Sequence, residues 1–444
     1  MNEYYCEMSE IAEELGHDVG VISLPFAPAI YGITTPETFE FVMKTKFEYF
    51  EKGKFVDERV QDLLGNGIFN SDGERWSVQR KIFSKIFTVS AFKDYCTTTF
   101  RSKTMTLKSI LEQKAVTGEI VDVDKLFYKL TVDSFCQIAY GVDFNSLEKD
   151  IPFSDDFNAA QVIIARRFIS PFWKIEDYFN LNHFRMRGYV KTIRGFAGEV
   201  VDQRTAEIKD GQGHNGTDLL SFFMEYTRED GTKFGREDTI DMIINFIRGG
   251  RDATGQALSW YLYELNRNPR VLKKLREEID AVFGSSEFPT YDQVKSMKYA
   301  LAIFYETLRC WPGLVRNAKT ATRNVKLPNG IIIPKGDTVL WSSLAFGRSK
   351  KIWGSNARVF LPERWLDRER LPSQFEYPVF NAGPRICPGK TLSEVEVIFV
   401  IVSLLHKFDI EIQNIEHVQP ARSLSLPIAN GMYCKISLRK QASG

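Results

Sequence analysis

Hydrophobic side chains recur at helical spacing over most of the chain. Apolar residues that return every three or four positions form one face of a helix, so this pattern predicts long helices rather than strands. The expected helices cover residues 76–87, 128–140, 187–208, 237–266, 269–283, 299–310 and 391–408.

Strand-like alternation is confined to shorter stretches. Residues 331–342 and 434–440 alternate in character among Pro, Gly and Asn turn residues, which predicts short strands mostly in the carboxy-terminal third. Residues 209–218 are typical of a flexible connector, and no internal repeat or low-complexity tract divides the chain. We therefore expect a mainly α fold with small β-sheets, forming one domain over residues 1–444.

Composition narrows the function classes. Lys and Arg number 58 against 57 Asp and Glu, so the formal net charge of +1 gives no basis for nucleic-acid binding. The six cysteines contain no C-x-x-C pair, which argues against a zinc knuckle or a disulfide framework. The most apolar run, residues 395–405, contains Glu396 and is about half the ~20 residues that cross a bilayer. The sequence therefore indicates a globular protein of near-zero net charge in a reducing compartment.

One loop, FNAGPRICPGK, encloses a single cysteine in glycine and proline. A thiolate is a soft ligand for iron, and Pro388 suits the first turn of a helix, so Cys387 is expected at a helix amino terminus that stabilises its charge. Gly383 allows a tight turn whose amides point at the sulfur, and Gly389 lets a flat cofactor lie close to the backbone. Arg385 is expected to meet a carboxylate of that cofactor.

The spacing of this loop outweighs the alternative, an ordinary buried thiol. Phe380, Gly383, Arg385, Cys387 and Gly389 match F-x-x-G-x-R-x-C-x-G, which resembles the haem-binding loop of the cytochrome P450 family. The resemblance implies that Cys387 is the axial thiolate ligand of the iron of haem b. It also implies the cytochrome P450 fold, with haem between a long distal helix and the helix after the cysteine loop.

A second motif carries buried charge. Glu306 and Arg309 lie three residues apart on an otherwise apolar helical pattern, so both need partners. The alternative for the pair alone is an exposed ion pair. FLPERW supplies Arg364, and E-x-x-R followed by P-E-R is similar to the family's structural triad, which the resemblance implies holds the core and the cysteine loop.

A third motif supplies cations for the cofactor. Trp76 and Arg80 lie four residues apart on one helical face and present an indole N–H and a guanidinium. Packing and solvation are the ordinary interpretation of such a pair. The pair also matches the family's W-x-x-x-R, which implies that both side chains bind a haem propionate.

The expected helix 237–266 contains the reaction site that the resemblance implies. Its adjacent glycines cost about 2 kcal/mol relative to alanine, and in the family the pair that includes Gly250 opens a groove for oxygen. The family's acid–threonine pair relays protons, but this chain has Asp252 followed by Ala253. Because alanine donates no hydrogen bond, Thr254 or a water is the candidate replacement.

Residues 62–87 narrow the resemblance to eukaryotic fatty-acid and alkane omega-hydroxylases. This implies hydroxylation of a fatty acid at or near its omega end, with O₂ and with electrons from NADPH through a separate cytochrome P450 reductase; cytochrome b5 is a further candidate donor. Lys81, Lys85 and Lys390 are candidates for reductase docking. Arg166 or Arg167 is a candidate partner for the substrate carboxylate.

Apolar residues near these motifs are candidates for the substrate wall, with ordinary core as the alternative for each. The candidates are Phe69, Phe246, Ile247, Trp311, Leu314, Val315 and Leu426.

Two other activities stay open. Ala253 motivates a haem-thiolate isomerase, dehydratase or peroxygenase that acts on an oxidised lipid, and Asp252 and Thr254 argue against it. A haem-binding sensor without turnover is the third hypothesis. Microsomal members carry an amino-terminal membrane helix that this sequence lacks. We therefore expect a truncated form of a protein of the endoplasmic reticulum membrane, on its cytosolic face, that is soluble as given.

Overall fold

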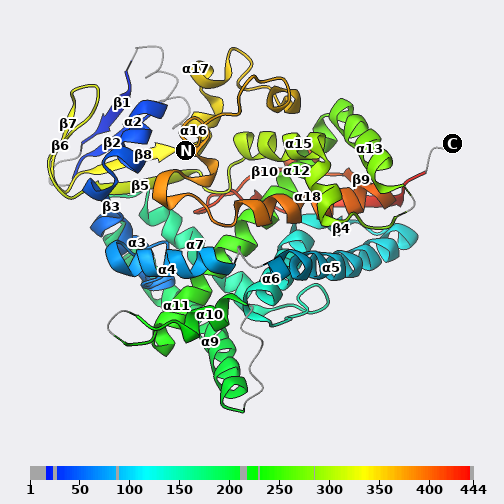
Figure 1. Ribbon diagram of the computed structural model, residues 1–444, viewed down its shortest axis with the longest axis horizontal. Coiled ribbons are helices and arrows are strands. Elements are labelled where there is room, and N and C mark those ends of the chain that lie inside the picture. Colours follow the sequence, from blue (N-terminus) through cyan, green and yellow to red (C-terminus); the bar gives the residue numbers. More distant parts are fainter. Residues whose placement is uncertain are drawn as a thin grey trace.

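The computed structural model describes residues 17–23, 28–86, 90–210, 218–228, 231–284 and 286–440 (Figure 1). Helices make up most of this part of the chain, as predicted. The first of them are α2 (Pro36–Glu40), α3 (Gly53–Leu64), α4 (Gly73–Ile86), α5 (Ser90–Thr117), α6 (Val123–Tyr140), α7 (Pro152–Arg167), α8 (Trp173–Phe179), α9 (Asn182–Lys209) and α10 (Leu219–Glu225). The others are α11 (Arg236–Ile247), α12 (Ala253–Arg267), α13 (Pro269–Phe283), α14 (Tyr291–Ser296), α15 (Lys298–Cys310), α16 (Ser343–Arg348), α17 (Lys350–Trp353) and α18 (Lys390–Lys407).

The expected helix 237–266 is present but not continuous. It consists of α11, a π-helical segment η3 (Arg248–Asp252) and α12. The hydroxyl of Thr131 on α6 donates to the carbonyl of Arg251 over 3.0 Å, which satisfies one backbone group of the irregular turn. Single-turn π segments are frequent at functional sites. We call α11, η3 and α12 together the central helix.

The strands form small sheets at the edges of the helical body (Figure 1). The largest has the order β1 (Val19–Ile22), β2 (Ile30–Ile33), β8 (Thr338–Ser342), β5 (Arg316–Ala321) and β3 (Phe50–Glu51), with β2 and β8 parallel. A second has the order β4 (Val121–Asp122), β12 (Tyr433–Leu438) and β9 (Phe408–Ile412). Two-stranded pairs join β6 (Val325–Lys326) to β7 (Ile332–Ile333) and β10 (Gln419–Pro420) to β11 (Ile428–Ala429).

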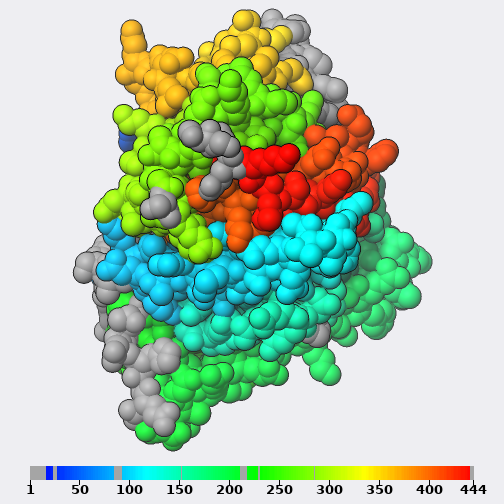
Figure 2. Space-filling model, turned by 90° about the vertical axis from the view of Figure 1, so that its right-hand side faces the viewer, coloured from blue at the N-terminus to red at the C-terminus, as the bar shows by residue number. Residues whose placement is uncertain are grey.

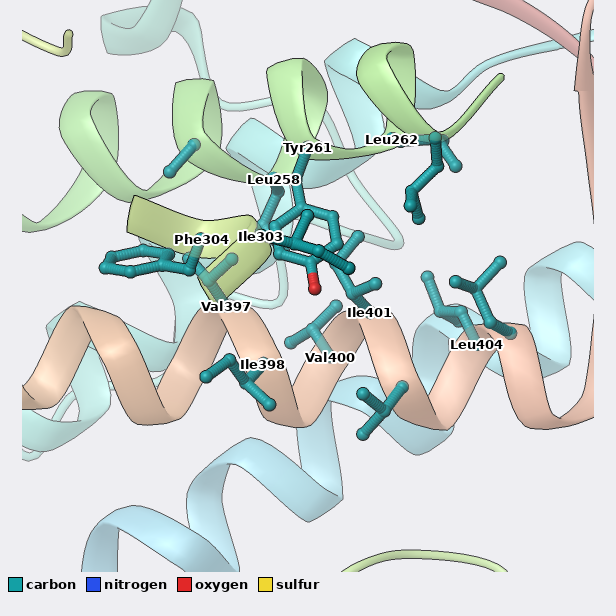
Figure 3. Packing of buried hydrophobic residues seen from close by; sticks show 14 of the residues in the cluster. Leu258, Tyr261, Leu262, Ile303, Phe304, Val397, Ile398, Val400, Ile401 and Leu404 are labelled. Carbon is teal, nitrogen blue, oxygen red and sulfur yellow. The ribbon is translucent and has the colours of Figure 1, made fainter. Parts of the chain in front are cut away.

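The main core lies where α12, α15 and α18 meet (Figure 3). Leu258 and Tyr261 of α12 face Ile303 of α15 and Ile401 of α18, and all four side chains are buried. The Tyr261 hydroxyl donates to the backbone carbonyl of Ala300, so the one polar group at this contact has a partner. This packing fixes the central helix against the helix that follows the cysteine loop.

Two features differ from the expectations. Helix α5 lies beside β12 and is visible in light blue beneath the red carboxy-terminal strands in Figure 2. Its apolar stripe is interrupted by buried Thr104 and Lys108, so its hydrophobic periodicity is weak. Three of the five strands of the largest sheet, β1, β2 and β3, come from the amino-terminal end of the chain, outside the carboxy-terminal third where strands were mostly expected. Residues 211–217 of the expected connector lie outside the described residues.

Candidate active site

The cysteine loop is held by backbone geometry on both sides of the thiol. The Cys387 amide donates to the carbonyl of Phe380 over 2.7 Å, which closes the loop. Helix α18 begins at Lys390 with Gly389 as its N-cap, so Cys387 lies two residues before the cap rather than directly before the helix. Phe380 is partly buried against the main core. The loop therefore holds the sulfur near the amino terminus of α18.

Opposing effects act on the thiol. Burial raises the pKa of Cys387, whereas the backbone N–H groups of Gly389 and Lys390 and the charge of Arg80 lower it. The net shift is upward, so these groups do not by themselves keep the sulfur ionised. The side chain of Cys387 is nevertheless accessible, whereas those of Cys96, Cys136 and Cys434 are buried. A positive ion at the sulfur would complete the stabilisation of the thiolate.

Gly383 is required for a different reason than expected. Its φ is 59°, and an added Cβ would lie 2.0 Å from the carbonyl oxygen of Met43. Its amide donates to the side chain of Gln374 over 3.1 Å rather than pointing at the sulfur. Gly383 thus lets the cysteine loop pack against the backbone of Met43, in the segment between α2 and β3.

Arg385 connects the cysteine loop to the segment before α4. Its guanidinium donates to the carbonyl of Ser71 and to Asp72 over 2.9 and 2.6 Å, and lies 4.3 Å from the ring centroid of Trp76. Its buried Nε has no hydrogen-bond partner. Burial lowers the pKa of Arg385 to about 10, against the effect of Asp72. One face of this arginine is therefore still free to meet an anion.

Two lysines that the sequence analysis missed lie in the same region. Burial and the nearby Arg385 lower the pKa of Lys52 to about 7 and that of Lys319 to about 6. Arg80 on α4 is half-buried and takes part in no described ion pair; burial lowers its pKa and the charge of Cys387 raises it. The region therefore holds four basic side chains, those of Arg385, Lys52, Lys319 and Arg80, against the two carboxylates of Asp72 and Glu51.

A short turn after α3 carries Phe69 to the central helix. Asp241 accepts from the amide of Asn66 over 2.8 Å, and Asn245 accepts from the amide of Phe69 over 3.1 Å. An added Cβ at Gly249 would lie 3.5 Å from the Phe69 ring. Arg385 of the cysteine loop binds the carbonyl of Ser71 in this turn, and the central helix binds the amides of Asn66 and Phe69. The same stretch of chain is thus joined to both the cysteine loop and the central helix.

The two central glycines have different neighbours. An added Cβ at Gly250 would lie 2.0 Å from the ring of Phe135 on α6, so this glycine allows helix packing and does not face Phe69. Gly249 is the member of the pair that faces Phe69. The open space expected at this glycine pair therefore lies beside Gly249, whereas the missing side chain of Gly250 accommodates Phe135.

The proton-relay candidates occupy distinct environments. The two carboxylate oxygens of Asp252 accept from Arg251 over 2.7 Å and from Gln161 over 2.8 Å. The methyl group of Ala253 faces Gly313, whose added Cβ would lie 3.4 Å away. Thr254 is buried. The carboxylate of Asp252 is thus held in place by two hydrogen bonds. The residue after it, Ala253, presents an apolar methyl group to the segment that follows α15.

The structure brings the predicted triad together. Arg309 donates to both oxygens of Glu306 over 2.8 Å, and Arg364 donates to Glu306 over 2.9 Å. Glu306 also accepts from the indole of Trp365 over 2.9 Å, and all these side chains are buried. The residue before Glu306 on α15, Tyr305, accepts a hydrogen bond at its carbonyl from Tyr377, just before the cysteine loop. The triad thus lies within the packing that supports this loop.

Two neighbouring cavities share part of their walls, and the smaller one borders the central helix at Arg248. The larger, of about 230 Å³, is lined in part by Trp311 and Leu426; the smaller, of about 130 Å³, is lined in part by Phe69 and Leu314. They share Ala165, Arg316 and Ser423 in their walls. Four of the predicted wall residues are therefore at a cavity.

The other predicted wall residues line neither cavity. Phe246 stacks on Phe83 with ring centroids 4.5 Å apart, and Ile247 is buried in the same apolar cluster. Val315 is buried in a small cluster with Leu344. The ordinary core alternative accounts for their positions.

Arg167 is not available for a substrate carboxylate. It is buried and donates to Asp62 and Asp177 over 2.9 and 2.8 Å. Arg166 is exposed on α7.

The residues present fit the expected haem. Cys387 is an accessible thiol with two backbone N–H groups and Arg80 beside it. An added Cβ at Gly389 would meet only the Cys387 sulfur within 4 Å, at 3.9 Å, which leaves space for a flat ring. The orphaned Nε of Arg385 and the surplus of cations suit the two propionates.

Comparisons with known proteins agree with this arrangement. A family model described as Cytochrome P450 matches residues 6–434. The chain is 36% identical to the cytochrome P450 monooxygenase cyp1 of Mycosarcoma maydis, over 94% of this chain and 69% of that protein. It is 34% identical to cytochrome P450 CYP94D109 of Paris polyphylla, over 89% and 83% of the two chains, and 31% identical to cytochrome P450 94A1 of Vicia sativa, over 84% and 74%.

Proposed function

The chain belongs to the cytochrome P450 family, and from this premise we propose that it hydroxylates a fatty acid at or near the omega end. The protein is a haem-dependent monooxygenase that uses haem b with a cysteine thiolate ligand, O₂ and electrons delivered by a reductase. We further propose that the chain forms a single catalytic domain.

Each motif has a role in this proposal. Cys387 ligates the haem iron, and Trp76, Arg80 and Arg385 bind the propionates. The bound haem supplies activation of O₂. Asp252, held by Arg251 and Gln161, and Thr254 or a water move protons on the side of the central helix.

The smaller cavity is the observation that carries the choice of substrate. Its wall is mainly apolar, with Phe55, Val56 and Phe168 beside Phe69 and Leu314, and a few cations interrupt it. An apolar chain with one charged end matches this composition. The resemblance of residues 62–87 to omega-hydroxylases supports the same choice.

The test is product identification. The haem-loaded protein, a eukaryotic NADPH-cytochrome P450 reductase and ¹⁸O₂ are incubated with saturated and unsaturated medium- to long-chain fatty acids, with cytochrome b5 added in parallel. The proposal expects a hydroxy acid with one ¹⁸O atom at or near the terminal carbon, by mass spectrometry. Absence of any hydroxy acid across the panel would refute it.

Ala253 favours a second candidate, an isomerase, dehydratase or peroxygenase acting on an oxidised lipid. Such a reaction needs no proton relay, and the Ala253 methyl faces Gly313 where the family places a hydroxyl. Conversion of a lipid hydroperoxide without reductase or NADPH would support this candidate over hydroxylation.

We also propose that the protein works at the cytosolic face of the endoplasmic reticulum membrane. None of the helices in the described residues is both long and apolar enough to cross a bilayer. An apolar surface nevertheless lies on the turn before α8, on α8 and at the start of α9, and we call it the α8–α9 patch. Its members are the exposed Ile169, Phe172, Ile175, Tyr178, Phe179, Leu181 and Phe184.

A reductase is expected to dock near the cysteine loop. Lys81 is exposed on α4, and the ammonium group of Lys390 lies 3.9 Å from Glu394 with much of its side chain accessible. The side chain of Lys85 lies outside the described residues. These positions support docking through Lys81 and Lys390.

A further inference from the structure

Arg248 is a cation in the wall of the smaller cavity. It opens η3, directly before the glycine that faces Phe69, and lines the cavity together with Phe69 and Leu314. Its guanidinium carbon lies 5.4 Å from the centroid of the Phe69 ring. One arginine beside two glycines forms no recognisable motif, so spacing along the chain does not predict its role.

No anion in the described residues pairs with Arg248. It takes part in no ion pair or hydrogen bond with them, and its buried Nε has no partner. Burial lowers its pKa and the charge of Asp252 raises it, but both oxygens of Asp252 are already bound by Arg251 and Gln161. A guanidinium does not deprotonate in proteins, so this charge is present and uncompensated.

Other cations share the wall. Lys52 and Arg316 line the same cavity, and the ammonium group of Lys52 donates to the side-chain oxygen of Asn317 over 2.8 Å. Burial is the main cause of the low pKa of Lys52, and the charges of Arg385 and Arg248 lower it further. The potential inside the cavity is therefore positive, and a bound anion would lower the energy of all these groups.

We propose that Arg248 binds the anionic group of the substrate, a carboxylate, inside the cavity beside the central helix. A carboxylate accepts two parallel hydrogen bonds from a guanidinium, and the apolar wall around Phe69 takes the hydrocarbon. The inference rests on the proposed function only in naming the bound carboxylate as substrate. It replaces Arg166 and Arg167 as the expected partners of the substrate carboxylate.

The haem propionates are the competing partner for Arg248. Arg385, Arg80 and Lys319 are available to them, of which Arg385 lies at Trp76, whereas Lys52 is affected by the charges of both Arg385 and Arg248. Arg248 instead faces Phe69 in the cavity wall. We therefore assign Arg248 to the substrate.

The test compares a carboxylate with its uncharged analogue. Dissociation constants of dodecanoate and 1-dodecanol are measured by isothermal titration calorimetry on the haem-loaded protein, without reductase or NADPH. Variants are Arg248→Met and Arg248→Lys, with Arg166→Met as the control that removes an exposed arginine. Haem loss to an acceptor protein is timed for each.

The inference expects a preference for dodecanoate in the native protein and in Arg166→Met. Arg248→Met should weaken dodecanoate binding by about 10- to 100-fold, the usual contribution of a charge-assisted hydrogen bond, and leave dodecanol binding unchanged. Arg248→Lys should keep part of the preference. An unchanged preference in Arg248→Met overturns the inference, and faster haem loss in that variant with an unchanged preference assigns Arg248 to the propionates instead.

The two hypotheses fail separately. Carboxylate binding that depends on Arg248, in a protein that hydroxylates no fatty acid, would support this inference and refute the proposed function. Fatty-acid hydroxylation with equal binding of dodecanoate and dodecanol would support the proposed function and refute this inference.

Discussion

At the scale of single residues, Cys387 stands apart from the other described cysteines by its exposure and by the N–H groups directed at it. Cys387→Ala removes the only soft ligand of the loop, so we expect loss of the thiolate-type spectrum of the reduced carbon monoxide complex. Cys96→Ala, which removes a buried thiol from α5, is the matched control and should keep that spectrum. An unaltered spectrum in Cys387→Ala would remove the basis of the site.

Some of the site residues can be predicted from the sequence alone, and others cannot. Spacing along one loop was enough to identify Cys387, and the triad was predicted because Glu306 and Arg309 interrupt an apolar helix. Lys52 and Arg248 have no such local signal. They come into one cavity wall only through the packing of distant elements, which spacing along the chain does not encode.

At the scale of elements, the Glu306 cluster joins α15 to the Arg364 segment. Glu306→Gln leaves two buried guanidinium groups without their charge partner, so we expect a loss of about 3 to 5 kcal/mol in the free energy of unfolding. The measurement is urea denaturation followed by circular dichroism. Glu363→Gln, on the surface network with Arg270 and Lys274, is the control and should cost much less. Equal losses in the free energy of unfolding of the two variants would show that the Glu306 cluster stabilises the fold no more than the Glu363 network does.

Helix α18 packs a buried carboxyl group, Glu396, against Ser134 of α6, and this contact makes stability depend on pH. Burial raises the pKa of Glu396 to about 8, against the effect of its hydrogen bond from Ser134. The folded protein therefore keeps a proton that the unfolded chain releases, so stability is greatest at low pH and falls as pH rises from about 5 to about 8. Burial also raises the pKa of Asp124 to about 7, with the same sign.

The check is a pair of urea midpoints at pH 5.5 and 8.5. Glu396→Gln holds a neutral group at this place, so its midpoint should fall less between the two pH values than that of the native protein. Native and variant midpoints that change in parallel would show that Glu396 does not carry the effect. A fall in the native midpoint on acidification would contradict the sign.

The elements also show why part of the fold escaped prediction. The helix patterns that were recognised belong to segments with one apolar face, such as α13, whose predicted bounds match the structure. Helix α5 buries Thr104 and Lys108, whose polar groups mask its inner face. The π segment has no periodic signal, because it changes the backbone over a single turn.

At the scale of the whole molecule, the α8–α9 patch predicts attachment to a lipid surface. Phe172 and Phe179 are 65% and 77% exposed, which is unusual for large apolar side chains grouped together. Phe172→Asp with Phe179→Asp should reduce co-sedimentation with phosphatidylcholine vesicles. Val116→Asp on α5 alters an exposed apolar residue elsewhere and should not. Equal vesicle binding by all three proteins would contradict a role for the patch.

Insertion of oxygen into a fatty acid is the reaction that we propose for this haem-thiolate protein. The most direct measurement is hydroxy acid formed per NADPH consumed, for the purified haem-loaded protein with a eukaryotic reductase and a fatty acid. The account predicts that product closely tracks NADPH, because Thr254 or a water supplies the proton that Ala253 does not. NADPH consumed with peroxide as the only product, in the native protein and in Ala253→Thr alike, would contradict it.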